Sequence, residues 1–127
     1  MKPVCLVLGA GAGIGGTVAA KFATEGYHAC LCRRSDQAGL DRMVKKIEEE
    51  GGTASGYLIN AIEDNTLEEL IISIEKGHGP IEVLVYNLGA QSGMKLLHET
   101  SVKEFEWAWR IADLGLFRVA KTLMPLM

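Results

Sequence analysis

Three glycines with the spacing of a phosphate-binding turn follow the first apolar run of the chain. The run ends in the series GAGAGIG, which places glycines at Gly9, Gly13 and Gly15 around Ile14. A pyrophosphate needs backbone N–H donors without side chains in the way, and glycines at a helix start supply both. We expect Gly9 to permit a sharp exit from the strand, and a β-carbon at Gly13 or Gly15 to push the ligand outward. The spacing therefore predicts a dinucleotide-binding site.

Two arginines, Arg33 and Arg34, end the second apolar run. In dinucleotide sites the ribose nearest the adenine lies at this point, where an acidic residue would accept hydrogen bonds from a free 2′-hydroxyl. This chain has no acidic residue there, and a guanidinium matches a 2′-phosphate by charge-assisted bonds. The pair favours NADP(H) over NAD(H), with a solvated basic turn as the alternative.

The elements that must position these residues alternate between strand and helix. The apolar runs predict four strands, at Val4 to Leu8, His28 to Cys32, Ala54 to Ile59 and Val83 to Tyr86. Helical spacing and capping residues predict four helices, at Ile14 to Glu25, after Ser35, from the capping box Thr66-x-x-Glu69, and from the capping box Ser101-x-x-Glu104. Right-handed crossovers then give a three-layer α/β fold whose parallel sheet has the order 3-2-1-4. The chain reverses between strands one and four, which opens a crevice flanked by the glycine turn and the turn at Asn87.

The last predicted helix is apolar on more than one face. One stripe is expected to pack on the core: Phe105, Trp109, Ala112, Leu116, Val119 and Leu123. Trp107, Leu114 and Phe117 occupy other faces, so this helix needs a second packing partner. We expect a homodimer formed through it.

Composition limits the possible classes of protein. With 127 residues, 48% hydrophobic and 23% charged, the chain fits a single domain over residues 1–127. The net charge of −3 argues against a nucleic-acid partner. Apolar stretches are too short for a membrane span and no signal peptide is evident, so we expect a cytoplasmic protein.

The cysteines and histidines show no pattern typical of a metal site. Cys5, Cys30 and Cys32 lie in apolar segments, which indicates buried, reduced thiols, with the last two on one face of a strand. The three histidines stand singly along the sequence. We therefore predict no bound metal.

The glycine spacing, the arginine pair and the sequence Asn87-Leu88-Gly89-Ala90 after the fourth strand together resemble the cofactor motifs of the short-chain dehydrogenase/reductase family. The resemblance covers the whole chain but only the amino-terminal half of a typical member, without the later strands. It implies a Rossmann-like fold and hydride transfer between a nicotinamide cofactor and a small carbonyl or alcohol. It also implies that Asn60, with Ala61 or Ile62, lies beside the adenine, and that Asn87, Gly89 and Ala90 line the cofactor.

The catalytic residues that the resemblance implies are missing from these 127 residues. None of the three tyrosines has a lysine four residues later. Aligning Gly115 and Phe117 with the family pattern places Ala112 at the helix asparagine, or Asp113 if the alignment shifts by one residue. We therefore assign no residue a catalytic role. The alternative function is a non-catalytic dinucleotide-binding or interaction protein. A flavodoxin-like signalling domain without nucleotide is disfavoured, because the glycines would then lack a purpose.

Overall fold

The computed structural model describes residues 1–89 and 95–127. Its four strands form one parallel sheet in the order β3-β2-β1-β4, as the sequence predicts. The strands are β1 (Val4–Leu8), β2 (His28–Arg33), β3 (Thr53–Leu58) and β4 (Ile81–Tyr86). The fourth strand begins two residues earlier than expected, because Val4 pairs with Ile81 before the register shifts at Cys5.

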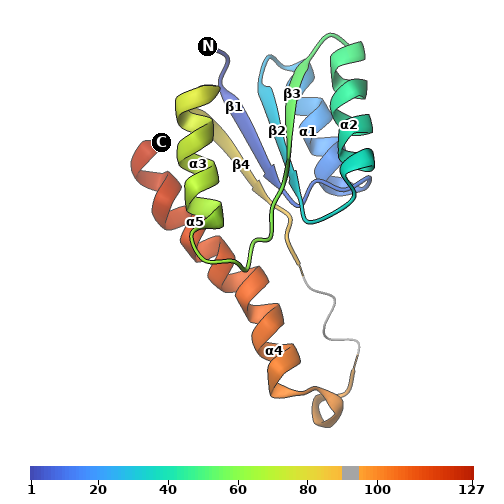
Figure 1. The fold of residues 1–127 in the computed structure, drawn as a ribbon, viewed down its shortest axis with the longest axis vertical. Coiled ribbons are helices and arrows are strands. Elements are labelled where there is room, and N and C mark those ends of the chain that lie inside the picture. Colours follow the sequence, from blue (N-terminus) through green and yellow to red (C-terminus); the bar gives the residue numbers. More distant parts are fainter. Residues whose placement is uncertain (90–94) are drawn as a thin grey trace.

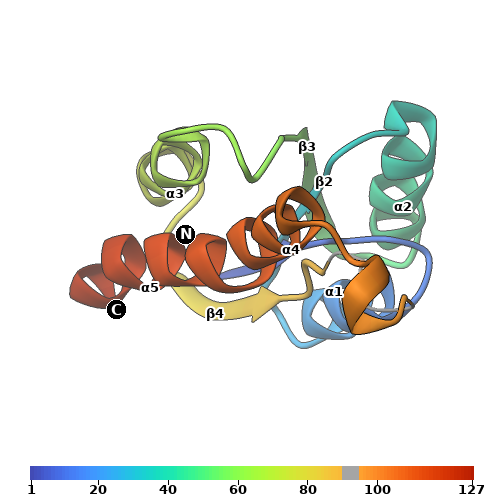
Figure 2. The same ribbon diagram turned by 90° about the horizontal axis from the view of Figure 1, so that it is seen from below.

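Helices cover both faces of the sheet, which gives a Rossmann-like αβα fold (Figures 1 and 2). One face packs against α1 (Ile14–Thr24) and α2 (Gln37–Glu49), and the other against α3 (Thr66–Gly77) and α5 (Gly115–Leu123). Side chains of β1 alternate between the two cores, with Leu6 on the α3 side and Cys5 on the α1 side. All five residues of β1 are buried, as expected for a central parallel strand.

The parallel arrangement brings the carboxyl ends of the strands to one edge of the sheet. The backbone N–H of Gly9 donates to the carbonyl of Cys32 at 2.9 Å, and the N–H of Asn87 donates to the carbonyl of Leu8 at 2.8 Å. The glycine turn is therefore held between the ends of β2 and β4. This is the edge at which the chain reverses direction between β1 and β4.

The C-terminal helix is continuous but not uniform. Between α4 (Val102–Trp109) and α5 lies a π-helical turn, Arg110–Leu114, and a short 3₁₀ turn, Met124–Leu126, follows α5. The single core stripe predicted for this helix is wrong, because α4 extends beyond the end of the sheet and the π turn changes the helical period before α5. Val119 and Leu123 are buried, whereas Phe105 and Trp109 remain 67% and 46% exposed. Figure 1 shows α4 extending beyond the end of the sheet.

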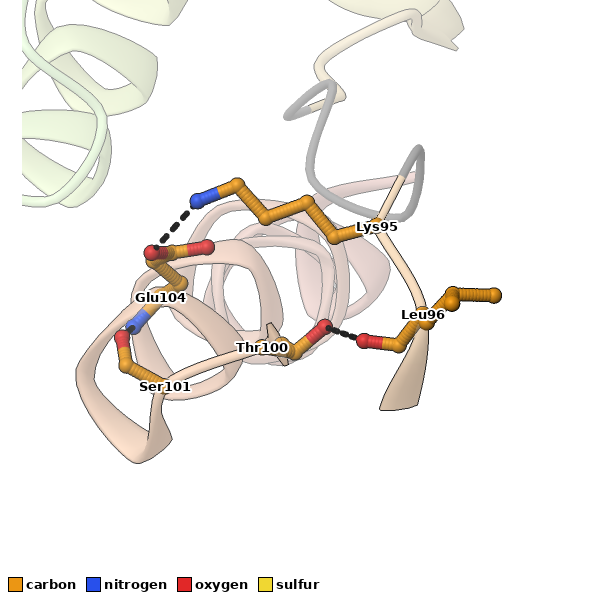
Figure 3. Close-up of polar contacts among 5 residues, drawn as sticks. All are labelled: Lys95, Leu96, Thr100, Ser101 and Glu104. Atoms are coloured by element: carbon orange, nitrogen blue, oxygen red, sulfur yellow. Dashed lines mark hydrogen bonds and ion pairs between the residues drawn. The ribbon is translucent and has the colours of Figure 1, made fainter. Parts of the chain in front are cut away.

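The predicted cap of this helix is confirmed at Ser101. Its hydroxyl accepts a hydrogen bond from the N–H of Glu104 at 3.0 Å (Figure 3). The Glu104 carboxylate does not complete a capping box but pairs with Lys95 at 3.0 Å. Thr100 donates to the carbonyl of Leu96, at the start of the 3₁₀ turn Leu97–Glu99. These contacts connect the start of α4 to the segment that precedes it.

Two other predicted caps are wrong. Helix α2 is capped by Asp36 and not by Ser35, since the Asp36 carboxylate accepts from the N–H of Gly39 at 3.0 Å. Helix α3 begins after Asn65, which adopts a left-handed conformation and makes no side-chain cap, so Thr66 is already helical. In both cases a neighbouring residue with φ near +65° sets the chain direction before the helix starts. Among the helices of the described part, none has the length and apolar character needed to cross a membrane.

Candidate dinucleotide-binding site

Gly9 makes the turn after β1 possible. Its φ is +90°, a conformation that residues with a β-carbon rarely adopt. A β-carbon at this position would also collide with the backbone carbonyl of Asn87. Both observations fit the sharp exit predicted for Gly9, and they add a close approach to β4 that the sequence did not indicate.

Gly13 and Gly15 have different roles in this turn. Gly13 is the N-cap of α1, and a β-carbon there would meet no atom within 4 Å, so the space in front of it is open. A β-carbon at Gly15 would instead collide with the carbonyl of Gly9 and lie 3.0 Å from the Cα of Ala10. The expected reason for Gly15 is therefore corrected: its missing side chain lets α1 pack on the turn and does not make room for a ligand.

The N-terminus of α1 is available to an anion. In the described part of the chain, no group accepts a hydrogen bond from the N–H of Gly13 or Ile14. Ile14 is 73% exposed, and the first turn carries no acidic side chain. Unpaired N–H groups and the positive end of the helix dipole together favour a phosphate at this position.

Arg33 ends β2 and faces a hollow beside the glycine turn. Its guanidinium lies 3.7 Å from the Asp36 carboxylate and 3.8 Å from the sulfur of Met43, and the side chain is mostly buried. The same hollow is lined by Arg42 and Lys46, one turn apart on α2. Neither residue is among the predicted site residues, although their spacing of four on one helix face was the signal that could have found them.

Arg34 does not line this hollow. It is exposed and lines a second cavity of about 140 Å³ at the carboxyl edge of the sheet. Five other predicted site residues or neighbours also line this cavity: Gly9, Arg33, Asn60, Ala61 and Gly89. The cavity is smaller than a typical small-ligand pocket of about 300 to 1,000 Å³, so it can enclose only part of a dinucleotide.

Trp107 and Ile111 complete this cavity from the C-terminal helix. Both residues come from a segment distant in sequence from the glycine turn. The sequence indicated Trp107 only as a surface for another subunit, and no spacing in the sequence connects it to the strand ends. An indole at a cavity wall offers a flat apolar face on which an aromatic ring can stack.

Asn60 orients the turn that follows β3. Its side-chain oxygen accepts a hydrogen bond from the N–H of Ile62 at 3.3 Å, and its backbone carbonyl accepts from the N–H of Glu63 at 3.1 Å. The amide oxygen keeps a second lone pair, and the amide nitrogen keeps its donors. The side chain can therefore hold its own turn and still contact a ligand in the cavity.

Asn87 joins the two turns of the site. Its side-chain amide donates to the carbonyl of Gly9 at 3.1 Å, so it bonds another segment of the chain and not only its own turn. Asn87 does not line the 140 Å³ cavity, whereas Gly89 does. Ala90, the remaining predicted residue, lies outside the described residues.

Tyr86 and Ala112 determine what proton chemistry this part of the site offers. The Tyr86 hydroxyl donates to the carbonyl of Ile111 in the π turn, and a β-carbon at Gly115 would collide with this hydroxyl. Burial, with a smaller contribution from Asp113, raises the pKa of Tyr86 to about 12. This phenol is therefore protonated at neutral pH and already engaged. The side chain of Ala112, in the same π turn, carries no exchangeable proton.

Comparisons with known proteins agree with this geometry. A family model described as short chain dehydrogenase matches residues 3–127. A 3-oxoacyl-acyl-carrier-protein reductase from Thermotoga maritima is 29% identical over 126 residues, which cover 98% of this chain and 50% of the reductase. The chain thus spans about half the length of the curated relatives that it matches.

Solved structures show the same relationship. An actinorhodin polyketide ketoreductase variant with NADPH superposes with a TM-score of 0.87 at 30% identity, covering 96% of this chain and 46% of the ketoreductase. A metagenomic short-chain oxidoreductase in complex with NADP shares the fold at 24% identity and a TM-score of 0.92, covering 98% of this chain and 56% of its own. The matched part in each case is about half of the known protein.

Proposed function

The chain belongs to the short-chain dehydrogenase family, and on that basis we propose that residues 1–127 form one domain that binds NADP(H) for hydride transfer between a small carbonyl compound and its alcohol. One observation carries the choice of cofactor. Arg33, Arg42 and Lys46 line a common hollow directly beside the open N-terminus of α1. Three cations face one acid there, Asp36, which leaves net positive charge for a 2′-phosphate.

Each part of the site has a task in this proposal. The N–H groups of Gly13 and Ile14 would hold the pyrophosphate at the start of α1. Asn60 and Ala61 would contact the adenine, and the Trp107 indole would lie against its ring. A bound nicotinamide would donate or accept the hydride. Gly9 and Asn87 hold the turns together, through the close approach and the hydrogen bond described above.

Thermal unfolding with each cofactor tests the proposal. NADPH at about 100 times its dissociation constant should raise the free energy of unfolding by about 2.7 kcal/mol. Arg33→Ala should weaken NADPH binding by about 1.5 to 3 kcal/mol and leave NADH nearly unchanged, because only NADPH carries the 2′-phosphate. The measurement is the shift in melting temperature over a titration of each cofactor.

Lys45→Ala is the matched control for this experiment. Lys45 also lies on α2, but it pairs with Glu49 at 3.9 Å and does not line the hollow. We expect it to leave both affinities unchanged. Equal losses for NADPH and NADH in Arg33→Ala would reject the 2′-phosphate contact, and the absence of stabilisation by either cofactor would reject the proposed function.

Carbonyl reduction also needs a proton donor at the developing alkoxide. These 127 residues contain no Tyr-x-x-x-Lys pair, and the Tyr86 hydroxyl is bonded to the Ile111 carbonyl. We therefore assign no catalytic residue within them. A second candidate function is a dinucleotide-binding protein without catalysis, since neither the engaged Tyr86 hydroxyl nor the Ala112 side chain offers a proton in this part of the site. NADPH oxidation in the presence of small aldehydes and ketones distinguishes the two functions.

We also propose that the protein is a homodimer through its C-terminal helix. Val102, Phe105 and Trp109 on or next to α4 are 83%, 67% and 46% exposed, which is unusual for large apolar side chains so close in sequence. A dimer mass by analytical ultracentrifugation at micromolar concentration is expected for the unmodified chain. Phe105→Glu should shift it to monomer, whereas Lys103→Ala, at an exposed polar position of the same helix, should not. A monomer mass for the unmodified chain would refute the dimer.

A reducing compartment such as the cytoplasm fits this proposal. Cys5, Cys30 and Cys32 are all free and buried. Burial raises the pKa of the Cys5 thiol to about 11, so this thiol is protonated and unreactive at neutral pH. Proteins in reducing compartments keep such thiols without disulfides.

A further inference from the structure

Two histidines and a cysteine that are separate in sequence meet at the amino-terminal edge of the sheet. His28 begins β2, and Cys30 follows two residues later on the same face. His78 is the C-cap of α3, and α3 runs antiparallel to the strands, which brings its last turn back to their amino ends. One potential ligand atom from each of the three lies within 4.8 Å of the other two.

Hydroxyl groups of β3 surround the first imidazole. His28 Nδ1 lies 2.8 Å from the Thr53 hydroxyl, and His28 Nε2 lies 2.9 Å from the Ser55 hydroxyl. Ser55 is the register partner of Cys30 across the β2–β3 pair. The Nε2 atom of His28 is therefore on the side of the ring that faces the thiol.

The second imidazole completes the cluster from α3. The rings of His28 and His78 stack with their centres 4.5 Å apart and an angle of 18° between their planes. His78 Nε2 lies 2.9 Å from the Tyr57 hydroxyl. Cys30 is fully buried beneath the rings, whereas both histidines are half-buried, so solvent reaches the cluster past the imidazoles.

The donor set has a definite chemical preference. Two imidazoles and a thiol suit borderline and soft transition metals, above all zinc, and not magnesium or calcium, which prefer oxygen ligands. Imidazole binds the metal in its neutral form.

We propose that His28, Cys30 and His78 bind a zinc ion at this edge of the sheet. Bonds of about 2.0 to 2.3 Å in a tetrahedral site separate the ligand atoms by about 3.3 to 3.8 Å. To reach this geometry, the stacked imidazoles must rotate until a nitrogen lone pair of each ring points at the same metal, and His28 Nε2 must exchange the Ser55 hydroxyl for the metal. Thr53 would accept a hydrogen bond from His28 Nδ1–H and fix the ring orientation, as second partners of metal-bound histidines do. A water molecule takes the fourth position, within reach of the Tyr57 hydroxyl.

Metal binding displaces one proton from the cluster. Cysteine binds zinc as the thiolate, so the zinc ion replaces the thiol proton of Cys30, and the metal charge stabilises the thiolate.

This site lies at the opposite end of the strands from the cofactor. His28 and Arg33 are the first and last residues of β2, and five residue steps along a strand span about 16 Å. The two sites share no side chain among those described. A failure of one assignment consequently leaves the other intact.

Cobalt titration tests the metal site, because four-coordinate Co²⁺ reports its ligands by absorption. The chain should bind one equivalent of Co²⁺ with visible d–d bands of tetrahedral intensity and a near-ultraviolet thiolate-to-cobalt band, and Zn²⁺ should displace it. Cys30→Ser should abolish the charge-transfer band, and His78→Ala should weaken Zn²⁺ binding by about tenfold or more. The affinity of NADPH should not change in either variant.

Two variants control for other thiols and histidines. Cys5→Ser removes a buried thiol of the neighbouring strand that faces the other core, and His98→Ala removes a histidine of the 3₁₀ turn far along the chain. Both should keep the cobalt spectrum. Absence of tetrahedral bands in the unmodified chain, or a charge-transfer band that persists in Cys30→Ser, would overturn the proposal. If circular dichroism shows that Cys30→Ser does not fold, His78→Ala tests the site instead, because replacing a half-exposed ring should not unfold the chain. Unchanged Zn²⁺ affinity in His78→Ala would then reject the site.

Discussion

Gly9→Ala is expected to lower the free energy of unfolding by about 3 kcal/mol or more, which is a large share of the stability of a domain this size. Two costs add at this position. The φ of +90° is strained for any residue with a β-carbon, and the new methyl group would collide with the Asn87 carbonyl. To relieve the collision, β4 would move away from the turn. This movement would lengthen the hydrogen bond from the Asn87 side-chain amide to the Gly9 carbonyl. Urea unfolding followed by circular dichroism measures the loss.

Gly26→Ala measures the cost of the left-handed conformation without the cost of a collision. Gly26 closes α1 with a φ of +96°, almost the same conformation, but a β-carbon there meets nothing within 4 Å. This variant should lose only about 1 kcal/mol, the cost of the left-handed conformation alone. If Gly9→Ala proves no more costly than Gly26→Ala, the close approach between the glycine turn and β4 does not constrain the fold.

Gly13→Val should weaken both NADPH and NADH by about 100-fold or more, equivalent to about 2.7 kcal/mol, while the chain stays folded. The position is open to solvent, so a valine side chain fits without displacing protein atoms. It would occupy the space in front of the α1 N-terminus, where the pyrophosphate is proposed to lie. Replacing glycine at an N-cap by valine costs only about 1 kcal/mol of stability. Isothermal titration with each cofactor measures the effect.

Gly77→Val is the matched control for this prediction. Gly77 ends α3, is exposed, and likewise has no atom within 4 Å of a new β-carbon, but it lies away from the glycine turn. It should retain the affinity for both cofactors. Unchanged cofactor affinity in Gly13→Val would mean that the phosphates bind elsewhere on the molecule.

Gly13 and Gly15 show which features of the glycine motif could be predicted from the sequence and which could not. The spacing predicted a strand, a turn and a helix start, and all three are present. It treated both glycines as space for a ligand, yet only Gly13 faces open space, and Gly15 packs against the carbonyl of Gly9. A glycine pattern indicates where the backbone comes close to another group, but not whether that group belongs to a ligand or to the protein itself.

The predictions of the helix caps and of the last helix were wrong for related reasons. Ser35 and Asp36 are both good capping residues, and the left-handed φ of Asp36 that decides between them depends on where β2 ends. In the last helix, the Tyr86 hydroxyl bonds the Ile111 carbonyl within the π turn, and this contact crosses from a different element. A helical wheel assumes a constant period and a core along the whole helix. Here the π turn changes the period, and α4, which carries Phe105 and Trp109, extends beyond the end of the sheet.

The sequence by itself determined the strands, their parallel order and the glycine turn, because these follow from local periodicity, backbone freedom and the handedness of crossovers. The positions of Arg42 beside Arg33, of Trp107 at the cavity and of His78 over His28 were decided only by the tertiary structure. Each of these contacts joins side chains from different elements, and their distance depends on how helices pack on the sheet. Packing of that kind is cooperative over the whole core, so no short stretch of sequence encodes it.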